Sequence, residues 1–199
     1  NANGRIERGE AAGNVRNLFE LYDADRDGSV NGAEAARGPL GNVRSPDQTY
    51  PVRLNIDLGG KRVEVIAKPT AHGADNTIVR FVDGTNVVFA SDWITVRRVP
   101  FGGDVATADE IALARSVEAL DFEHFVCSHG RLGTKADVSA NLRYRETVAA
   151  AVSDAIAAGK TLEQTRDSVL MSDYKDWEFY EQQRPQNVAG AYRILAARR

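Results

Sequence analysis

The sequence is poor in the residues that crosslink small secreted domains or build cysteine-rich metal modules. Its 199 residues contain one cysteine, Cys127, and three histidines. A single thiol excludes an intrachain disulfide framework and a zinc module made of several cysteines. One thiol is compatible with the cytosol or the periplasm, and we slightly favour a periplasmic or extracellular location.

An excess of charge of one sign and long apolar runs are also lacking. Lysine and arginine total 25 against 28 aspartates and glutamates, a net charge of −3, so no strong field exists to recruit nucleic acid or an acidic membrane surface. No stretch approaches the ~20 apolar residues that span a bilayer. We therefore expect neither a nucleic-acid partner nor a membrane partner. The remaining composition, 43% hydrophobic and 27% charged, is that of a chain with a sizeable core.

The first residues, NANGRIERGE, contain neither an initiator methionine nor a basic-then-apolar signal peptide. We expect the gene product to begin further upstream.

Apolar periodicity divides the chain into three parts. Residues 1–48 are polar, rich in glycine and aspartate, and contain one helical stretch near 14–22. Residues 49–135 read as a β/α core. Residues 136–199 read as an α-helical tail, with helices expected over 136–158, 162–171, 174–182 and 187–197.

Within the β/α core, the alternation of apolar and polar residues predicts strands rather than helices. Residues 52–58 and 63–67 flank Gly59-Gly60, which indicates a hairpin. Residues 77–82 and 87–90 flank a second turn and are expected to be buried on both faces. A helix capped by Thr107 and a short strand over 125–127 follow. These elements predict an α+β layered fold.

An aspartate-rich stretch, Asp23 to Glu34, has the spacing of an EF-hand calcium loop. Gly28 stands where such a loop turns sharply. The candidate oxygen ligands for Ca²⁺ are Asp23, Asp25, Asp27, Ser29, Asn31 and Glu34. The segment resembles EF-hand proteins over about residues 14–38, but Gly38-Pro39 limits the second helix to about one turn. A structural ion is thus expected rather than a sensor, and a solvated acidic turn remains the alternative.

Three further side chains at expected strand ends are candidate transition-metal ligands. His72 and His129 each precede a glycine, and Asp92 ends the strand over 87–90. Each also has an ordinary interpretation. A histidine after a strand often forms only a hydrogen bond, and an aspartate there often caps a helix.

The order of these residues, with their surroundings, resembles the C-terminal part of the metallo-β-lactamase superfamily over about residues 45–195. The matching segments are PDQTY at 46–50, LGG at 58–60, AHGADNT at 71–77, VVFASD at 87–92 and CSHG at 127–130. The resemblance implies an αββα sandwich, of which this chain contains the C-terminal half with a helical tail. It also implies that His72, Asp92 and His129 bind one or two zinc ions, with Asp92 bridging them.

The sequence departs from the family in three ways. Ser91 and Ser128 replace the glycines before Asp92 and His129, and the family's H-x-H-x-D-H motif is absent. We therefore expect the chain alone to be inactive, and an upstream segment or a separate polypeptide to supply the missing ligands. When complete, the protein is expected to be a zinc hydrolase of a small-molecule substrate. The alternative is a non-catalytic calcium-binding protein on a degenerate scaffold.

The other candidates have weaker support. We interpret His124 as a surface residue and Cys127 as an inert thiol within an apolar run. Aromatic residues with helical spacing in the tail are expected in the core or on a docking surface, with a substrate pocket as the alternative. They are Tyr174, Trp177, Phe179, Tyr180 and Tyr192.

Overall fold

A computed structural model describes residues 3–40, 46–69, 73 and 76–198. The chain divides into two units, Asn1–Thr49 and Tyr50–Arg199, and each is described by itself. Within the part of the chain that the structure describes, no helix has the length and apolar character needed to cross a membrane.

The described residues of the first unit form a short two-stranded sheet and three short helices. Its strands, β1 and β2, are antiparallel, and Ile6 lies opposite Val30. A small core forms around Phe19 and Val30, both nearly inaccessible to solvent. The elements are β1 (Arg5–Glu7), α1 (Gly13–Asn17), α2 (Phe19–Tyr22), β2 (Ser29–Asn31) and α3 (Gly32–Arg37). The continuous helix expected over 14–22 is wrong, because the backbone leaves helical geometry at Leu18.

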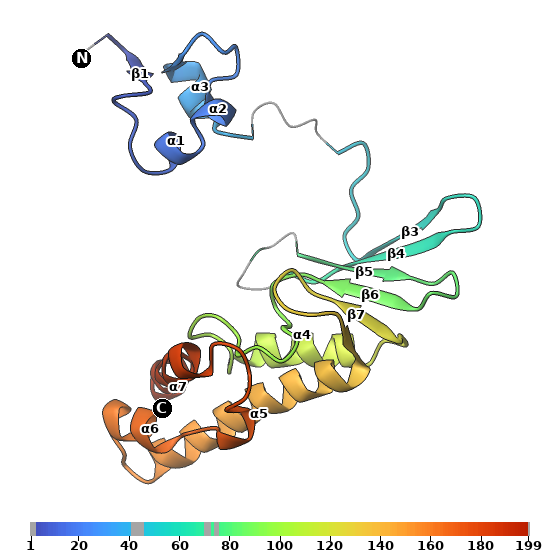
Figure 1. Cartoon of the computed structure of the whole chain (residues 1–199), viewed down its shortest axis with the longest axis vertical. Coiled ribbons are helices and arrows are strands. Elements are labelled where there is room, and N and C mark those ends of the chain that lie inside the picture. The colour runs from blue at the N-terminus through green and yellow to red at the C-terminus, as the bar shows by residue number, and fades with distance from the viewer. Residues whose placement is uncertain (1–2, 41–45, 70–72, 74–75, 199) are drawn as a thin grey trace. The chain divides into compact units, whose positions relative to one another are not determined.

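A six-stranded sheet forms the centre of the second unit (Figure 1). Its strands are β3 (Arg53–Asp57), β4 (Arg62–Ala67), β5 (Thr77–Phe81), β6 (Val87–Ala90), β7 (His124–Val126) and β8 (Gly133–Thr134). They pair in chain order, and each pair is antiparallel except β6 with β7, which is parallel. Both predicted hairpins are confirmed. The backbone of Gly59 and Gly60 in the first turn is left-handed, with φ +65° and +96°. Glycine adopts this conformation without steric strain because it has no Cβ.

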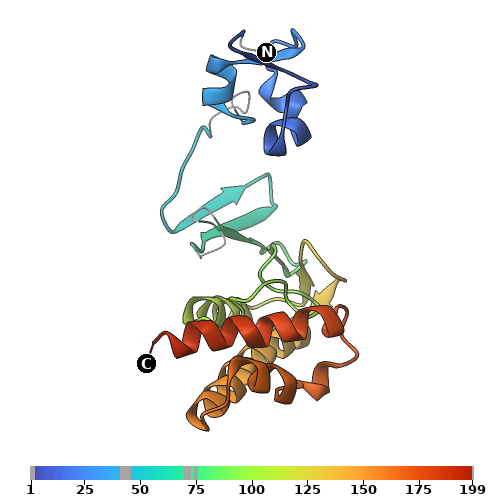
Figure 2. The ribbon, with the colours of Figure 1, turned by 90° about the vertical axis from the view of Figure 1, so that its left-hand side faces the viewer.

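One face of the sheet packs on helices, which confirms the predicted α+β layers. Ile66, Ile78 and Ala90 lie directly opposite one another on β4, β5 and β6, so they share this face. They are buried in one cluster with Leu113 of α4 (Ala108–Glu118) and Leu142 of α5 (Lys135–Ala157). Figures 1 and 2 show α4 and α5 along this side of the sheet.

The start of α4 follows the capping pattern read from the sequence. The Thr107 hydroxyl accepts a hydrogen bond from the Glu110 amide at 3.2 Å. This bond satisfies one of the amides that have no partner within the helix, as predicted.

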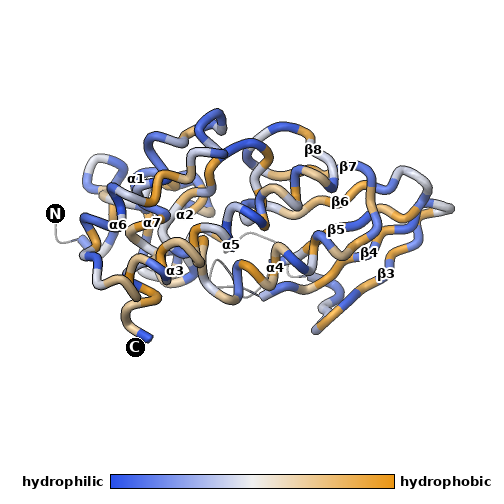
Figure 3. Tube along the Cα trace, turned by 90° about the horizontal axis from the view of Figure 1, so that it is seen from below, coloured by the Kyte–Doolittle hydropathy of each residue, from blue (hydrophilic) through white to orange (hydrophobic). Residues whose placement is uncertain are grey.

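The opposite face of the sheet is also apolar but is only partly covered. Leu54, Val65, Val79 and Phe89 are in register across β3, β4, β5 and β6, and each is half-buried. The colouring in Figure 3 shows hydrophobic residues along the strands as well as along the helices. The expectation that β5 and β6 are buried on both faces is thus corrected, since α4 and α5 cover one face only.

The C-terminal helices pack around a second core. They are α5, α6 (Leu162–Ser168), a short 3-10 turn (Ser172–Tyr174) and α7 (Tyr180–Ala196). The two helices expected over 174–182 and 187–197 are wrong, because α7 passes through Pro185 without interruption. Proline removes one helical hydrogen bond, but Val188 and Ala191 in the next turns are completely buried. Their burial stabilises the continuous helix.

A buried polar network joins α4, α5 and the segment after β6. The guanidinium of Arg145 on α5 pairs with Glu110 at 3.2 Å and donates to Asn141 at 2.8 Å and to the carbonyl of Trp93. Asn141 in turn donates to the carbonyl of Thr95 at 3.1 Å. Burial lowers the pKa of Arg145, and the Glu110 carboxylate opposes that effect. The network fixes the backbone of residues 93–95 against the helices.

Replacing Arg145 by alanine removes the cation from a buried pair and should reduce the free energy of unfolding by roughly 3–5 kcal/mol. Arg143→Ala, on the exposed side of the same helix, is the matched control and should change it by less than about 0.5 kcal/mol. Urea denaturation of the three proteins measures both effects. Equal stability of the two variants would contradict a structural role for the network.

Candidate functional site

The two strands that pair in parallel, β6 and β7, place two of the predicted metal ligands together. Parallel strands end at the same edge of a sheet. Asp92 lies two residues after β6 and His129 three residues after β7. Their side chains meet, with 3.4 Å between Oδ1 of Asp92 and Nε2 of His129. Asp92 is 34% exposed and His129 is 62% exposed, so both are accessible to a ligand.

These two residues line a pocket of about 350 Å³. The rest of the lining comes from the segment that follows Asp92, namely Thr95, Arg98 and Phe101. These three residues were not predicted from the sequence as part of a site. An arginine soon after a strand-end aspartate was the only signal available, and nothing in the local sequence indicates that it faces the pocket.

The serines that precede Asp92 and His129 contact each other. The hydroxyl oxygens of Ser91 and Ser128 lie 2.8 Å apart, so a hydrogen bond connects the residue before Asp92 to the residue before His129. Gly130, with φ +139°, packs so closely that a Cβ would lie 3.2 Å from Sγ of Cys127 and 3.3 Å from the Val96 amide nitrogen. Both features restrict the position of His129.

The third predicted ligand, His72, lies outside the described residues. His124 is exposed on β7, as expected, and does not line the pocket. The Cys127 thiol donates to the carbonyl of His129 at 3.4 Å. Burial raises its pKa, which disfavours the thiolate and is consistent with an inert thiol.

The donor set suits a transition metal but is incomplete within the described residues. One imidazole nitrogen and one carboxylate oxygen are donors that zinc accepts. A zinc site needs three or four protein ligands, and the described part of the chain brings two of them to this pocket. Asp92 and His129 could therefore supply only part of the ligands of such a metal centre.

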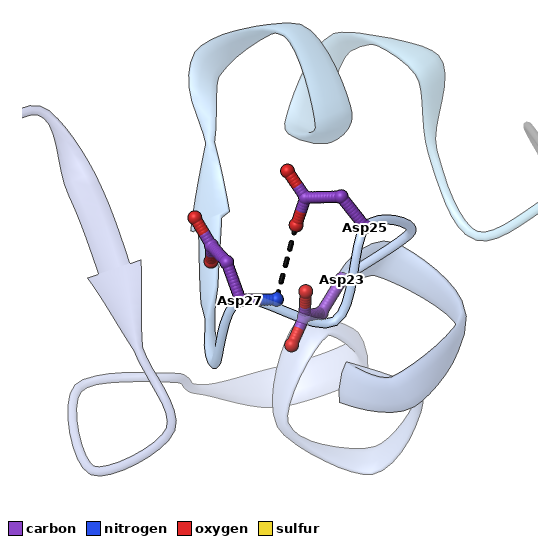
Figure 4. Close-up of side chains that lie close together, drawn as sticks. All are labelled: Asp23, Asp25 and Asp27. Carbon is purple, nitrogen blue, oxygen red and sulfur yellow. Dashed lines mark hydrogen bonds between the residues drawn. The ribbon is translucent and has the colours of Figure 1, made fainter.

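The clearest group of candidate metal ligands in the described residues lies in the first unit. Carboxylate oxygens of Asp23, Asp25 and Asp27 all lie within 4.8 Å of one another (Figure 4). Asp23 is 5% exposed, and its Oδ2 accepts from the Gly28 amide at 3.0 Å. Its other oxygen, Oδ1, is buried without a hydrogen-bond partner. An unsatisfied buried carboxylate oxygen is costly, and a cation at this position could satisfy it.

The remaining candidate calcium ligands stabilise the loop itself. The Asn31 side chain caps α3, accepting from the amides of Ala33 and Glu34 at 2.9 and 3.1 Å. Glu34 accepts from the amides of Asn31 and Ala24 at 3.0 and 2.9 Å, and these hydrogen bonds lower its pKa. Ser29 donates its hydroxyl to Asp27 at 2.8 Å. Asn31 and Glu34 thus form a capping box, which sequence spacing alone did not distinguish from ligation.

No family model matches the chain, and comparison with curated proteins also finds no match. Solved structures with a similar arrangement include a metallo-beta-lactamase from Pontibacter korlensis, at 20% identity and TM-score 0.42 over 58% of this chain and 55% of that one. An archaeal metallo-beta-lactamase superfamily protein from Sulfolobus tokodaii matches at 18% identity and TM-score 0.41, over 64% and 50%.

A metallo-beta-lactamase family protein from Thermus thermophilus matches at 14% identity and TM-score 0.47, over 92% of this chain and 57% of that one. The chain spans about half the length of these solved structures.

Proposed function

We propose that Tyr50–Arg199 contributes half of the metal centre of a metal-dependent hydrolase. The observation that carries the proposal is the meeting of Asp92 and His129, 3.4 Å apart at the edge of a pocket, after two parallel strands. Their order and flanking motifs are those in which the sequence resembles the metallo-β-lactamase superfamily. The substrate class we propose is a small molecule with an ester, thioester, amide, lactone or phosphodiester bond.

In this proposal Asp92 and His129 bind the metal, and His72 is a further ligand. Zinc is the proposed ion, because imidazole and carboxylate donors suit it. A zinc ion here would act as a Lewis acid and lower the pKa of water. The chain's own residues position the ion: the Ser91–Ser128 hydrogen bond holds the two ligand loops together.

The missing ligands are proposed to come from an upstream segment or a separate polypeptide. The support is the second apolar face of the sheet, where Leu54, Val65, Val79 and Phe89 are half-buried in register. Sheets that pack face to face interdigitate such side chains in a core about 10 Å thick. A second sheet on this face would bury them and bring its own strand ends toward the Asp92 edge.

We also propose that the first unit binds calcium through Asp23, Asp25 and Asp27. The specific observation is the buried, unpartnered Oδ1 of Asp23 within a group of three converging carboxylates. Oxygen-only donors suit a hard cation such as Ca²⁺ rather than zinc. The capping box of Asn31 and Glu34 keeps the loop in shape, and calcium coordination by Glu34 would exchange some of its amide hydrogen bonds for the ion.

The competing account is a calcium-binding protein without catalysis on a degenerate scaffold. It shares the calcium loop, so calcium binding does not separate the two. A transition metal bound at Asp92 and His129 would distinguish them, because only the hydrolase proposal requires it.

Natively purified protein with its upstream segment should contain zinc or a similar transition metal, and both Asp92→Ala and His129→Ala should lose most of it. His124→Ala is the matched control, because it removes an exposed histidine of β7 that does not line the pocket. Elemental analysis of the four proteins measures the metal. Equal metal content in His129→Ala and His124→Ala would exclude the proposed site.

The 199-residue chain alone should not hydrolyse an ester, thioester or β-lactam panel, because a metal with too few ligands is neither tightly bound nor well positioned. Supplying the upstream segment, fused or as a separate polypeptide, should restore zinc-dependent activity. Steady-state rates with and without a chelator test this. Zinc-dependent turnover by the isolated chain, or none by the completed protein on any substrate of the panel, would contradict the proposal.

Calcium should raise the melting temperature of the first unit. An ion that binds only the native state increases the free energy of unfolding by about 2.7 kcal/mol when its free concentration is one hundred times Kd. Asp23→Asn should remove most of this increase, because it removes the charge of the buried carboxylate. Glu34→Ala should also reduce it, and Asn31→Ala should reduce it less, since water can replace its oxygen. Zinc should not substitute. Differential scanning calorimetry with and without calcium measures each effect.

The matched control is Asp109→Asn, the same change on the exposed side of α4, which should leave the calcium-induced increase intact. No increase in the wild type at millimolar calcium would identify the loop as an acidic surface turn.

A further inference from the structure

Arg98 lines the Asp92–His129 pocket and lies beside two aromatic rings that contact each other. Its guanidinium carbon is 5.4 Å from the ring centre of Phe101 and 4.3 Å from that of Phe179. Phe101 is 62% exposed and Phe179 is 42% exposed, so both rings present apolar surface to solvent beside the arginine. Two exposed aromatic rings beside a cation form a surface that favours an apolar group next to an anionic one.

The described residues give the Arg98 side chain no ion pair. Its Nε is buried without an acceptor. Two other arginines of this unit, by contrast, have carboxylate partners: Arg115 contacts Glu146 at 2.6 Å, and Arg131 contacts Glu178 at 3.2 Å. Arg98 therefore retains donor capacity in a pocket, where an incoming anion can use it.

The backbone of Arg98 is held in place from two sides. Its carbonyl accepts from the Thr95 hydroxyl at 2.6 Å, and Thr95 is itself fixed by Asn141. On the other side, the Val99 amide donates to the carbonyl of Glu178, and the Glu178 amide donates to that of Arg97, both at 3.0 Å. These contacts join the segment after β6 to the segment before α7. They place Arg98 and Phe179 together although the two lie far apart in the sequence.

We propose that Arg98 binds an anionic group of the substrate, so that the pocket accepts organic anions whose apolar part lies against Phe101. The N–H donors along the edge of the planar guanidinium match the two oxygens of a carboxylate or phosphate. Because Arg98 and the metal-ligand candidates line one pocket, the anion would anchor the substrate beside Asp92 and His129. This inference rests on the proposed function for the reaction, but anion binding itself needs no metal.

A merely structural role for Arg98 is the competing explanation. A guanidinium against Phe101 and Phe179 also stabilises the junction between the two segments. That role would make substitution lower the melting temperature without changing the affinity for anions relative to neutral analogues.

Calorimetric titration of the full chain, treated with a chelator, tests the proposal with three probes: phenyl phosphate, benzoate and phenol. Arg98→Gln should reduce the affinity for at least one of the two anions at least tenfold and leave the affinity for phenol unchanged. Arg97→Gln, the same loss of charge at the exposed neighbouring residue, should change anion binding by less than twofold. Arg98→Lys keeps the charge but lacks the planar fork, so it should bind the anion more weakly than the wild type and more tightly than Arg98→Gln.

Comparison of phenyl phosphate with benzoate identifies which oxyanion the pocket prefers. Wild-type protein that binds neither anion, or equal weakening in Arg98→Gln and Arg97→Gln, would overturn the proposal. If Arg98→Gln does not fold, Arg98→Lys becomes the deciding variant. Unchanged anion affinity in Arg98→Lys would count against binding of the anion by the planar guanidinium. The chelator keeps these results independent of the metal, so a failure here leaves the metal-content experiment intact, and the reverse also holds.

Discussion

The parallel pairing of β6 with β7 is the constraint on which the candidate site depends. Val88 lies opposite Phe125 in this pairing, and both are completely buried. Because the strands are parallel, the residues that follow them leave the sheet at the same edge. Asp92 and His129 meet there, and α4 makes the connection between the two strands. An antiparallel pairing would have placed them at opposite ends.

The helices contribute to this edge as well as to the core. Arg145 and Asn141 of α5 hold the carbonyls of Trp93 and Thr95, so the segment after Asp92 is connected to the interior and not only to solvent. The same segment carries Arg98 into the pocket. Polar contacts thus extend from the helical layer to Trp93, which follows Asp92, and through Thr95 to the carbonyl of Arg98.

Local patterns predicted the hairpins, the Thr107 cap and the strand-end placement of Asp92 and His129, because these depend on neighbours in sequence. The continuity of α7 through Pro185 could not be predicted, because the burial of Val188 and Ala191 outweighs the helix-breaking tendency of the proline. The contact of Arg98 with Phe179 depends on tertiary packing and has no local signature. For the loop from Asp23 to Glu34, spacing identified the three clustered aspartates but not the capping role of Asn31 and Glu34.

The proposed transition-metal site lies at the edge formed by β6 and β7. Anomalous diffraction at the zinc absorption edge, from crystals of the natively purified protein, locates that metal directly. The proposed site predicts an anomalous peak at about 2.0–2.2 Å from both a carboxylate oxygen of Asp92 and a ring nitrogen of His129. A fully occupied zinc peak elsewhere, with this edge free of anomalous signal, would contradict it.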